Sequence, residues 1–299
     1  MALPLESVPN FSEGRDRETI DAIGSALGEH AALLDVHADV DHNRSVFTLV
    51  GAEEDLAAAL LAGIACARER IDLRRHQGAH PRIGAADVVP LVPIEPDDMP
   101  RARGAALALG TRIGLELELP VFLYGELAHG RGPAYFRRGG LAELERRIDA
   151  GEIVPDFGPT RLDPAAGGVL VGARRPLIAF NVNLRADDVE IARDIARAVR
   201  EANGGFPGVR ALGLDLPAVG LVQVSMNVED WEAAALHEIV ARIEAEARTH
   251  GVELAGSELV GLMPAGAAAA AAGAALRIEG FDASRVLELR LLGVDFARR

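Results

Sequence analysis

Apolar positions along the chain follow two spacings, one typical of helices and one typical of strands. Leu56, Leu60 and Ile64 share one face of a helix. Residues 219–228 alternate as in a half-exposed strand, with Gln223 on the polar side. The predicted strands are residues 3–8, 32–36, 45–50, 88–94, 121–124, 177–183, 211–216, 219–228 and 252–262. The predicted helices are residues 16–27, a segment from Glu53, residues 96–115, 141–149, 187–202, a segment marked by Trp231, Ala235, Ile239 and Ile243, and residues 265–275 and 284–292.

The order of these elements predicts an α+β fold made of two similar halves. Each half reads strand, helix, strand, strand, helix, strand, which is the ferredoxin-like, split βαβ order. We therefore predict one subdomain over residues 1–176 and another over residues 177–299, side by side with a ligand cleft between them. Residues 156–168 are rich in glycine and proline and predict a linker or a ligand-contacting loop. Asp187 and Glu190 resemble a capping box at the start of a helix.

Composition narrows the class of protein. Of the 299 residues, 49% are hydrophobic, which indicates a globular chain with a large core. The formal net charge of −14 argues against a nucleic-acid partner, but a basic cleft could still bind a small anion. The chain contains no lysine, which excludes a Schiff-base lysine and a P-loop lysine.

The cysteine count, the N-terminal sequence and the length of the apolar runs indicate the cellular compartment. Cys66 is the single cysteine, so an internal disulfide is excluded and a reducing compartment is expected. No signal peptide is evident at the N-terminus. The alanine-rich run at residues 267–272 is shorter than a membrane span. These features predict a cytoplasmic protein with no membrane association.

The densest group of chemically active residues is the segment from His76 to Asp87. It contains His76, His80 and Arg82, and an apolar strand follows it, so these side chains should lie on a loop held by a buried strand. Gly78 and Gly84 suggest backbone conformations that other residues resist. A histidine titrates near neutral pH, so this loop predicts a site where an anionic substrate binds and His80 moves protons.

Residues in and near the segment from His76 to Asp87 allow two interpretations, a carboxylate-binding site and a metal site. Arg44 and Arg82 are candidates to hold carboxylates, because a guanidinium binds a carboxylate through two parallel hydrogen bonds. A metal site is the rival interpretation, since His76 and His80 have the i, i+4 spacing of helical zinc ligands. Gly78 disfavours a helix there, so we expect no metal. Further ligands for such a site would come from His37, Asp39, Asp41 and His42.

A series of motifs is spread over nearly the whole chain. They are Val8-Pro9-Asn10-Phe11-Ser12-Glu13-Gly14-Arg15, Leu34-Asp35-Val36, Asn43-Arg44, His80-Pro81-Arg82-Ile83-Gly84-Ala85-Ala86-Asp87, Leu123-Tyr124-Gly125-Glu126, Pro155-Asp156-Phe157-Gly158-Pro159, Gly172-Ala173-Arg174, Leu177-Ile178-Ala179-Phe180-Asn181-Val182-Asn183-Leu184 and Ser257-Glu258-Leu259-Val260-Gly261-Leu262. Together these motifs resemble the glutamate formimidoyltransferase family, and we expect the likeness to be to its transferase portion alone, with no room for a cyclodeaminase portion.

The resemblance implies a reaction and a set of site residues. The reaction passes the formimidoyl group of N-formimidoyl-L-glutamate to tetrahydrofolate, as a step of histidine degradation, in a protein that is usually a homodimer. The catalytic histidine of the family falls on His80. The folate-contacting loop falls on Gly158, Pro159, Thr160, Arg161, Leu162, Asp163, Pro164, Ala165, Ala166 and Gly167. Folate is then a co-substrate.

Two positions depart from some relatives, and two other functions remain open. His37 stands where some relatives carry an acidic residue, and Ala166 where some carry an aromatic residue that could stack on the pterin. We therefore leave His37 out of the catalytic set. One alternative is a metal-dependent amide or amidine hydrolase that uses His37, Asp39, His76 and His80, and the other is a folate-binding protein without turnover.

Overall fold

The computed structural model describes residues 3–128 and 130–292. Contacts within the chain divide it into two compact units, Met1–Pro176 and Leu177–Arg299. Both units combine helices with a β-sheet, which confirms the predicted α+β class. The predicted cleft between the units stays a prediction. Among the described residues, no helix is both long enough and apolar enough to span a membrane.

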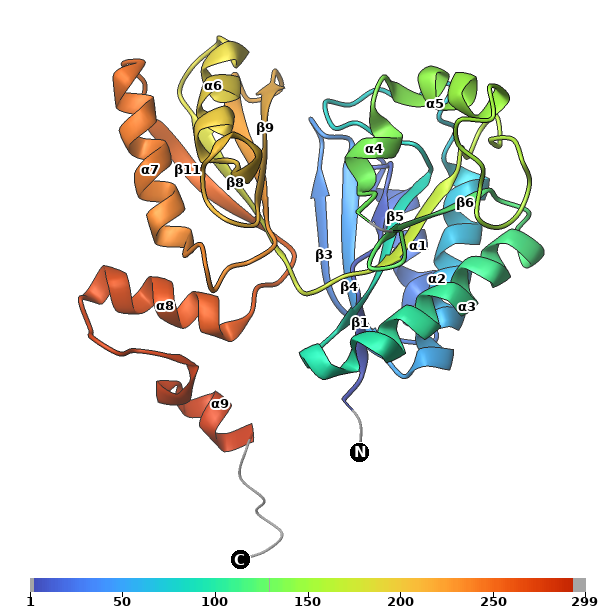
Figure 1. Ribbon diagram of the computed structural model, residues 1–299, viewed down its shortest axis with the longest axis horizontal. Coiled ribbons are helices and arrows are strands. Elements are labelled where there is room, and N and C mark those ends of the chain that lie inside the picture. Colours follow the sequence, from blue (N-terminus) through green and yellow to red (C-terminus); the bar gives the residue numbers. More distant parts are fainter. Residues whose placement is uncertain (1–2, 129, 293–299) are drawn as a thin grey trace, which may run out of the picture. The chain divides into compact units, whose positions relative to one another are not determined.

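Unit 1 is built on a seven-stranded sheet (Figure 1). The first strand is interrupted before Asn10, and its two parts each pair with the same two neighbours, antiparallel to both. The edge strand β3 pairs with β4. The strands are β1 (Leu5–Ser7), β2 (Asn10–Phe11), β3 (Ala32–Asp39), β4 (Arg44–Gly51), β5 (Ala86–Pro93), β6 (Val121–Gly125) and β7 (Val169–Ala173).

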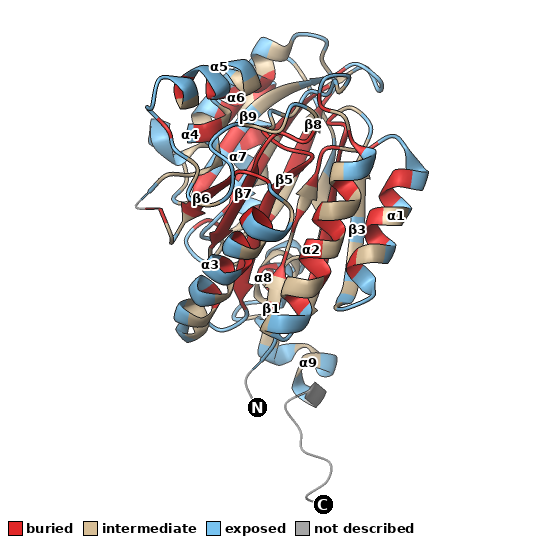
Figure 2. Cartoon of the chain, turned by 90° about the vertical axis from the view of Figure 1, so that its right-hand side faces the viewer, coloured by how far each residue is buried: buried red, intermediate tan, exposed pale blue. Residues whose placement is uncertain are grey.

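The sheet of unit 1 separates two apolar cores, and Figure 2 shows the long helices covering one face with their buried sides inward. Alternate residues of a strand point to opposite faces. Thus Val121 and Leu123 of β6 join the core under these helices, whereas Phe122 and Tyr124 join the core under the short helices. The long helices are α1 (Arg17–Gly28), α2 (Glu53–Arg70) and α3 (Met99–Glu116), with the 3₁₀ turn η1 (Pro96–Asp98), and the short ones are α4 (Pro133–Arg137) and α5 (Gly140–Asp149).

The strand β7 was not predicted from the sequence. It lies between β5 and β6 and is parallel to both, so its pairing partners are distant in sequence. It follows directly on the glycine-rich segment 156–168, which masks its short apolar run. Together with β6, strand β7 extends a β-α-β-β-α-β core formed by β1 to β5. If β1 and β2 are counted as one interrupted strand, the order across this core is β5, then β1 with β2, then β4, then β3.

Unit 2 has the same strand order in a four-stranded antiparallel sheet, β11-β8-β10-β9. Ile195 and Val199 of α6, and Ile239 and Ile243 of α7, pack on one face of this sheet. The elements are β8 (Ile178–Leu184), α6 (Val189–Val199), η2 (Glu201–Asn203), β9 (Val209–Leu216), β10 (Leu221–Val228), α7 (Leu236–Thr249), β11 (Leu254–Val260), α8 (Ala265–Leu276), η3 (Ala283–Arg285) and α9 (Leu287–Leu292).

Two predicted helix starts in unit 2 are wrong by a few residues. The N-cap of α6 is Asp188, whose carboxylate accepts the N–H of Glu190, and not Asp187. Helix α7 begins at Leu236, so Trp231 and Ala235 precede it. Trp231 nevertheless packs against the core, and apolar contact rather than helical position explains its place in the periodic pattern.

Candidate functional site in unit 1

The loop that carries His80 connects α2 to β5 and is tied to the turn between β3 and β4. The N–H of Ala79 donates to the carbonyl of Asp41 at 3.0 Å. A Cβ on Gly78 would lie 2.3 Å from the carbonyl oxygen of His42, so only glycine fits there. Gly84 is equally confined, because a Cβ there would lie 2.0 Å from the carbonyl oxygen of Gly168. Neither glycine has a positive φ, so close packing and not an unusual backbone conformation explains both of them.

His80 is half-buried at the end of this loop and is held as one tautomer. Its Nδ1 lies 2.8 Å from the carbonyl oxygen of Pro81. A carbonyl oxygen can only accept, so Nδ1 carries the proton and Nε2 keeps its lone pair. The ring lies 5.9 Å from that of His42, centroid to centroid. Burial, reinforced by the charges of Arg44 and Arg137, lowers the pKa of His80 well below its ordinary value. His80 is therefore neutral at pH 7 and able to accept a proton.

A buried ion cluster of Arg44, Asp87 and Arg137 lies beside His80. Arg44 Nη1 donates to Asp87 Oδ2 at 2.6 Å, and Arg137 Nη2 donates to the same oxygen. The other carboxylate oxygen of Asp87 accepts the N–H of Ile83 at 2.7 Å. Burial alone would raise the pKa of Asp87, but Arg137 and Arg44 outweigh it and hold that pKa well below its usual range. Two cations share one anion here, so the cluster carries a net positive charge.

The orientation of Arg44 is fixed from both sides. Its Nε donates to the side-chain oxygen of Asn10 at 2.9 Å, and its Nη1 binds Asp87. Among the described residues, the structure shows no further hydrogen bond from its Nη2 group. That Arg44 holds a carboxylate therefore stays a prediction. Its Nη2 group is available to bind that carboxylate.

Arg82 is placed differently from that prediction. Its Nε donates to the carbonyl of His80 at 3.1 Å, Nη1 to that of Asn43 at 3.3 Å, and Nη2 to that of His42 at 3.2 Å. Nη1 also donates to Nδ1 of His76, and Nη2 reaches the carbonyl of His80 as well. An arginine has five N–H donors, and these contacts occupy all of them. The observed geometry makes Arg82 a brace for the loop.

His76 belongs to the same brace. Its Nε2 also lies 3.2 Å from the carbonyl oxygen of Asn43, so both of its ring nitrogens contact protein groups or the Arg82 guanidinium. Burial and the charge of Arg82 lower its pKa to about 4. His76 and His80 do not share a helix, because the segment between α2 and β5 is a loop. No group of three or more potential metal ligands lies together in residues 3–128 and 130–292.

The segment predicted to contact folate, residues 158–167, is bound by its end to the strand that follows His80. Ala85 donates its N–H to the carbonyl of Ala166 at 2.8 Å, and Gly168 donates to that of Ile83 at 3.0 Å. Gly167, at φ +70°, leaves no room for a side chain, because a Cβ would lie 2.1 Å from the carbonyl oxygen of Ile83. The structure thus places the end of this segment against the base of the His80 loop.

Members of the 158–167 segment differ in how far a ligand could reach them. Gly158, Pro159, Thr160, Arg161 and Pro164 are exposed, whereas Leu162, Asp163 and Ala165 are half-buried. Ala166 and Gly167 are buried, and the methyl group of Ala166 packs in the core under the long helices. A pterin-stacking role at position 166 therefore has no exposed side chain to support it.

Asp87 and Arg137 were not among the predicted site residues. Asp87 is the last residue of the His80 motif, and its burial between β4 and α4 depends on tertiary structure. Pro133, at the first turn of α4, is a recognisable helix start, but nothing in the sequence links Arg137 to a carboxylate fifty positions earlier.

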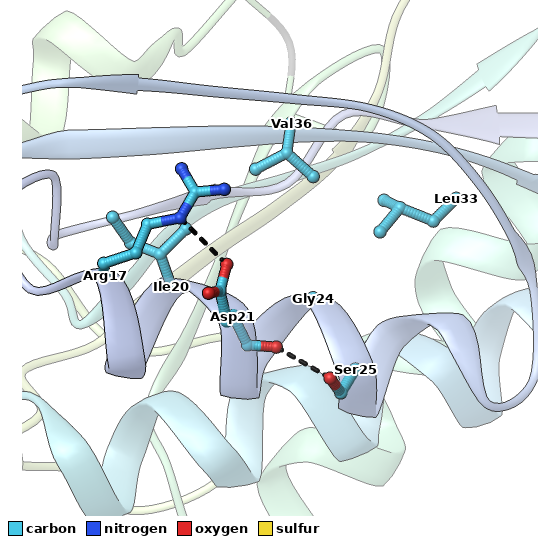
Figure 3. Close-up of a pocket in the computed structure, with 7 residues that line it drawn as sticks. All are labelled: Arg17, Ile20, Asp21, Gly24, Ser25, Leu33 and Val36. Atoms are coloured by element: carbon cyan, nitrogen blue, oxygen red, sulfur yellow. Dashed lines mark hydrogen bonds and ion pairs between the residues drawn. The ribbon is translucent and has the colours of Figure 1, made fainter.

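A shallow hollow of about 400 Å³ lies elsewhere in unit 1, between α1 and β3 (Figure 3). Arg17 and Asp21 of α1 form an ion pair at its rim, 3.1 Å apart, and Leu33 and Val36 of β3 form its apolar side. An exposed pair of this kind contributes little to stability or binding. None of the residues around His80 lines this hollow.

The lowered pKa values of His76 and His80 predict how stability depends on pH. Both histidines take up protons near pH 6.5 in the unfolded chain and at lower pH in the folded chain. Their contribution to the free energy of unfolding is thus fully present above about pH 6.5 and is lost as the pH falls. The loss is at most about 1.4 kcal/mol per pH unit for each extra proton that the unfolded state binds.

We expect urea unfolding at pH 5 to give a lower free energy of unfolding than at pH 7. The variant His76→Asn, measured in the same way, should lose less stability over this interval than the wild type, and the exposed-site variant His250→Asn should lose as much as the wild type. An unchanged pH dependence in His76→Asn would contradict the assignment.

Comparison with known proteins identifies the family of this chain. Residues 4–174 match the family described as formiminotransferase domain, N-terminal subdomain, and residues 179–281 match that described as formiminotransferase domain. A glutamate formimidoyltransferase of Streptococcus pyogenes serotype M1 is 38% identical over 98% of this chain and 100% of its own length. One of Thermoplasma acidophilum is 39% identical over 96% and 97%.

A longer relative shows the same likeness over part of its length. The formimidoyltransferase-cyclodeaminase of Rattus norvegicus is 41% identical over 88% of this chain, which spans 51% of that protein. Since the two family matches together cover most of the chain and follow its two units, the chain belongs to the formiminotransferase family.

Proposed function

We propose that this protein transfers the formimidoyl group from N-formimidoyl-L-glutamate to tetrahydrofolate, giving 5-formimidoyltetrahydrofolate and L-glutamate. The relatives named as glutamate formimidoyltransferases support this assignment over 98% and 96% of the chain. The observation that carries it is the geometry of His80, whose Nδ1 bonds the Pro81 carbonyl and leaves Nε2 as the proton acceptor, beside a cluster of net positive charge. The reaction is a step of histidine degradation.

The chemistry asks for proton transfer and for the positioning of two substrates. The folate nitrogen attacks the amidine carbon, a new C–N bond forms, and a tetrahedral intermediate results. His80 Nε2 takes the proton from the attacking nitrogen and returns it to the departing nitrogen of glutamate as the old C–N bond breaks. Holding both substrates in line lowers the barrier by making the step effectively unimolecular, and proton transfer by a positioned histidine adds about 10²–10⁴-fold.

The assignment of the remaining residues follows from what each can still bind. Arg44 holds a substrate carboxylate through its Nη2 group, and the exposed part of residues 158–167 contacts folate. Arg82 was predicted to hold a carboxylate as well, but its five N–H groups are in use, so we assign it to the loop. We also propose a cytoplasmic homodimer, in keeping with a single cysteine and with the family resemblance.

A direct assay tests this function. Purified protein is mixed with tetrahydrofolate, and the absorbance of 5-formimidoyl or methenyl folate is followed with and without N-formimidoyl-L-glutamate. We expect signal only when the donor is present and an unchanged rate after exhaustive chelation with EDTA. A rate that disappears with EDTA and returns with a divalent cation would favour the metal-dependent hydrolase. Folate binding without any transfer would favour a binding protein.

A further inference from the structure

Three arginines lie around His80, and their hydrogen bonds decide which of them can bind a ligand. The N–H groups of Arg82 are already hydrogen-bonded to backbone carbonyls and to His76. Arg44 uses Nε and Nη1 and retains Nη2. Within the part of the chain that the structure describes, Arg137 uses only Nη2, for Asp87. Its Nε is buried and has no hydrogen-bond partner among the described residues.

An unpartnered donor on a buried cation is costly. Because Nε is closed off from solvent, a ligand reaches this guanidinium through Nη1, for which the structure shows no hydrogen bond among the described residues. The side chain of Arg137 is 13% exposed, and that of its counter-ion Asp87 is fully buried. Because Asp87 also neutralises Arg44, the pair of guanidinium groups keeps about one positive charge beside His80. The remaining donors of a planar guanidinium suit the two oxygens of a carboxylate.

The backbone that presents Arg137 is fixed on both sides. Arg147 of α5 is buried, donates from Nη1 to the carbonyl of Tyr135 at 2.8 Å, and lies 4.5 Å from the centre of the Tyr135 ring. Phe136 is fully buried against Phe122 of β6, with ring centroids 5.4 Å apart. Arg137 follows directly on these two anchored residues, so its guanidinium loses little freedom when it binds a ligand.

We propose that Arg137 is a substrate-binding residue that holds a glutamyl carboxylate next to His80. This inference rests on the proposed function, since both substrates of that reaction carry such a group. One source is N-formimidoyl-L-glutamate, and the other is the glutamyl tail of folate. In either case the carboxylate binds Nη1 of Arg137 and places the rest of the substrate within reach of His80.

The test compares Arg137→Gln and Arg137→Lys with the matched control Arg138→Gln. Arg138 is the next residue, is exposed, and loses the same charge when it is replaced. We measure KM for N-formimidoyl-L-glutamate and, by calorimetry, Kd for L-glutamate and for tetrahydrofolate. Two truncated probes lack the glutamyl group: formamidine, which donates the same formimidoyl group and releases ammonia, and tetrahydropteroate, which is folate without its tail. Thermal unfolding of each variant shows whether it is folded.

We expect Arg137→Gln to raise KM and Kd for one glutamyl-bearing substrate by about 10- to 100-fold, the usual effect of losing a charge-assisted hydrogen bond. Arg137→Lys should recover part of this loss, because it keeps the charge but not the planar fork. The slower reaction with formamidine, or the binding of tetrahydropteroate, should be the same in wild type and variant. The substrate whose truncation abolishes the difference is the one that Arg137 holds.

Two outcomes would overturn the inference. One is an unchanged Kd for both glutamyl-bearing ligands. The other is an equal loss for full-length and truncated substrates, which a structural role of Arg137 would produce. If the wild type itself transfers no formimidoyl group, the proposed function fails, and the comparison of Kd values for L-glutamate and for tetrahydrofolate still decides the role of Arg137.

Discussion

Replacing His80 with alanine is expected to lower the turnover number by about 10²–10⁴-fold, the range that a positioned general acid–base group contributes. The ring is half-buried on a loop, and its one hydrogen bond among the described residues is to the adjacent Pro81 carbonyl. Its removal therefore leaves the Arg44–Asp87–Arg137 cluster and the Arg82 brace in place. Thermal unfolding and the Kd for tetrahydrofolate should remain close to those of the wild type.

A matched control separates loss of the reacting group from a general loss of histidine. His30 is exposed in the same unit and has no hydrogen bond or ion pair among the described residues, so His30→Ala should keep full turnover. Added imidazole should restore part of the rate of His80→Ala, because it can enter the space left by the side chain and accept the same proton. Turnover of His80→Ala within a few-fold of wild type would exclude His80 as the proton carrier.

The parts of the fold that the sequence predicted are those with a local cause. Leu56, Leu60 and Ile64 are all fully buried on α2, as their spacing predicted. Val222 and Val224 of β10 are likewise buried. The one exception on that strand is Gln223, which was predicted on the exposed side and is fully buried, with its amide bonded to Asn183 of β8 at 2.9 Å. Periodicity finds an element, but it does not report what covers its polar face.

The candidate site was predictable only in part, for a related reason. Chemistry-bearing residues that are crowded in sequence, such as His76, His80 and Arg82, mark the loop. Their separate tasks depend on which acceptors the fold brings to them. Arg82 was predicted to bind substrate and instead meets three backbone carbonyls, because Gly78 lets the loop approach residues 42 and 43 closely. Every residue has a backbone carbonyl, so the sequence does not indicate which carbonyls will accept hydrogen bonds from Arg82.

Arg137 is the converse case, a residue of the cluster that was not among the predicted site residues. It lies in a short helix of five residues whose sequence shows no strong periodicity. Its value to the site comes from Asp87, and the two meet because α4 packs over β5 and β6 through Phe136. A pairing between residues fifty positions apart is set by the topology of the sheet, and no local pattern encodes it.

Asp87 is where we expect the largest effect on stability. Replacing it with alanine leaves two buried guanidinium groups without their shared anion and frees the N–H of Ile83. Removing one partner of a buried ion pair typically costs about 3–5 kcal/mol. Asp87→Ala should therefore lower the free energy of unfolding by about that amount in urea titrations at pH 7, and turnover should fall with it.

Two comparisons distinguish this loss from that of an ordinary surface carboxylate. Asp149, at the exposed end of α5, has no hydrogen bond or ion pair among the described residues, and Asp149→Ala should change stability by no more than about 0.5 kcal/mol. Asp87→Asn preserves the shape and one acceptor but not the charge, so it should fall between wild type and Asp87→Ala. Because Arg137 and Arg44 keep the pKa of Asp87 low, its contribution should persist on acidification well below the range where His76 and His80 act. Equal stability of Asp87→Ala and Asp149→Ala would mean that water solvates the two arginines without their counter-ion, and that the cluster does not hold the His80 loop.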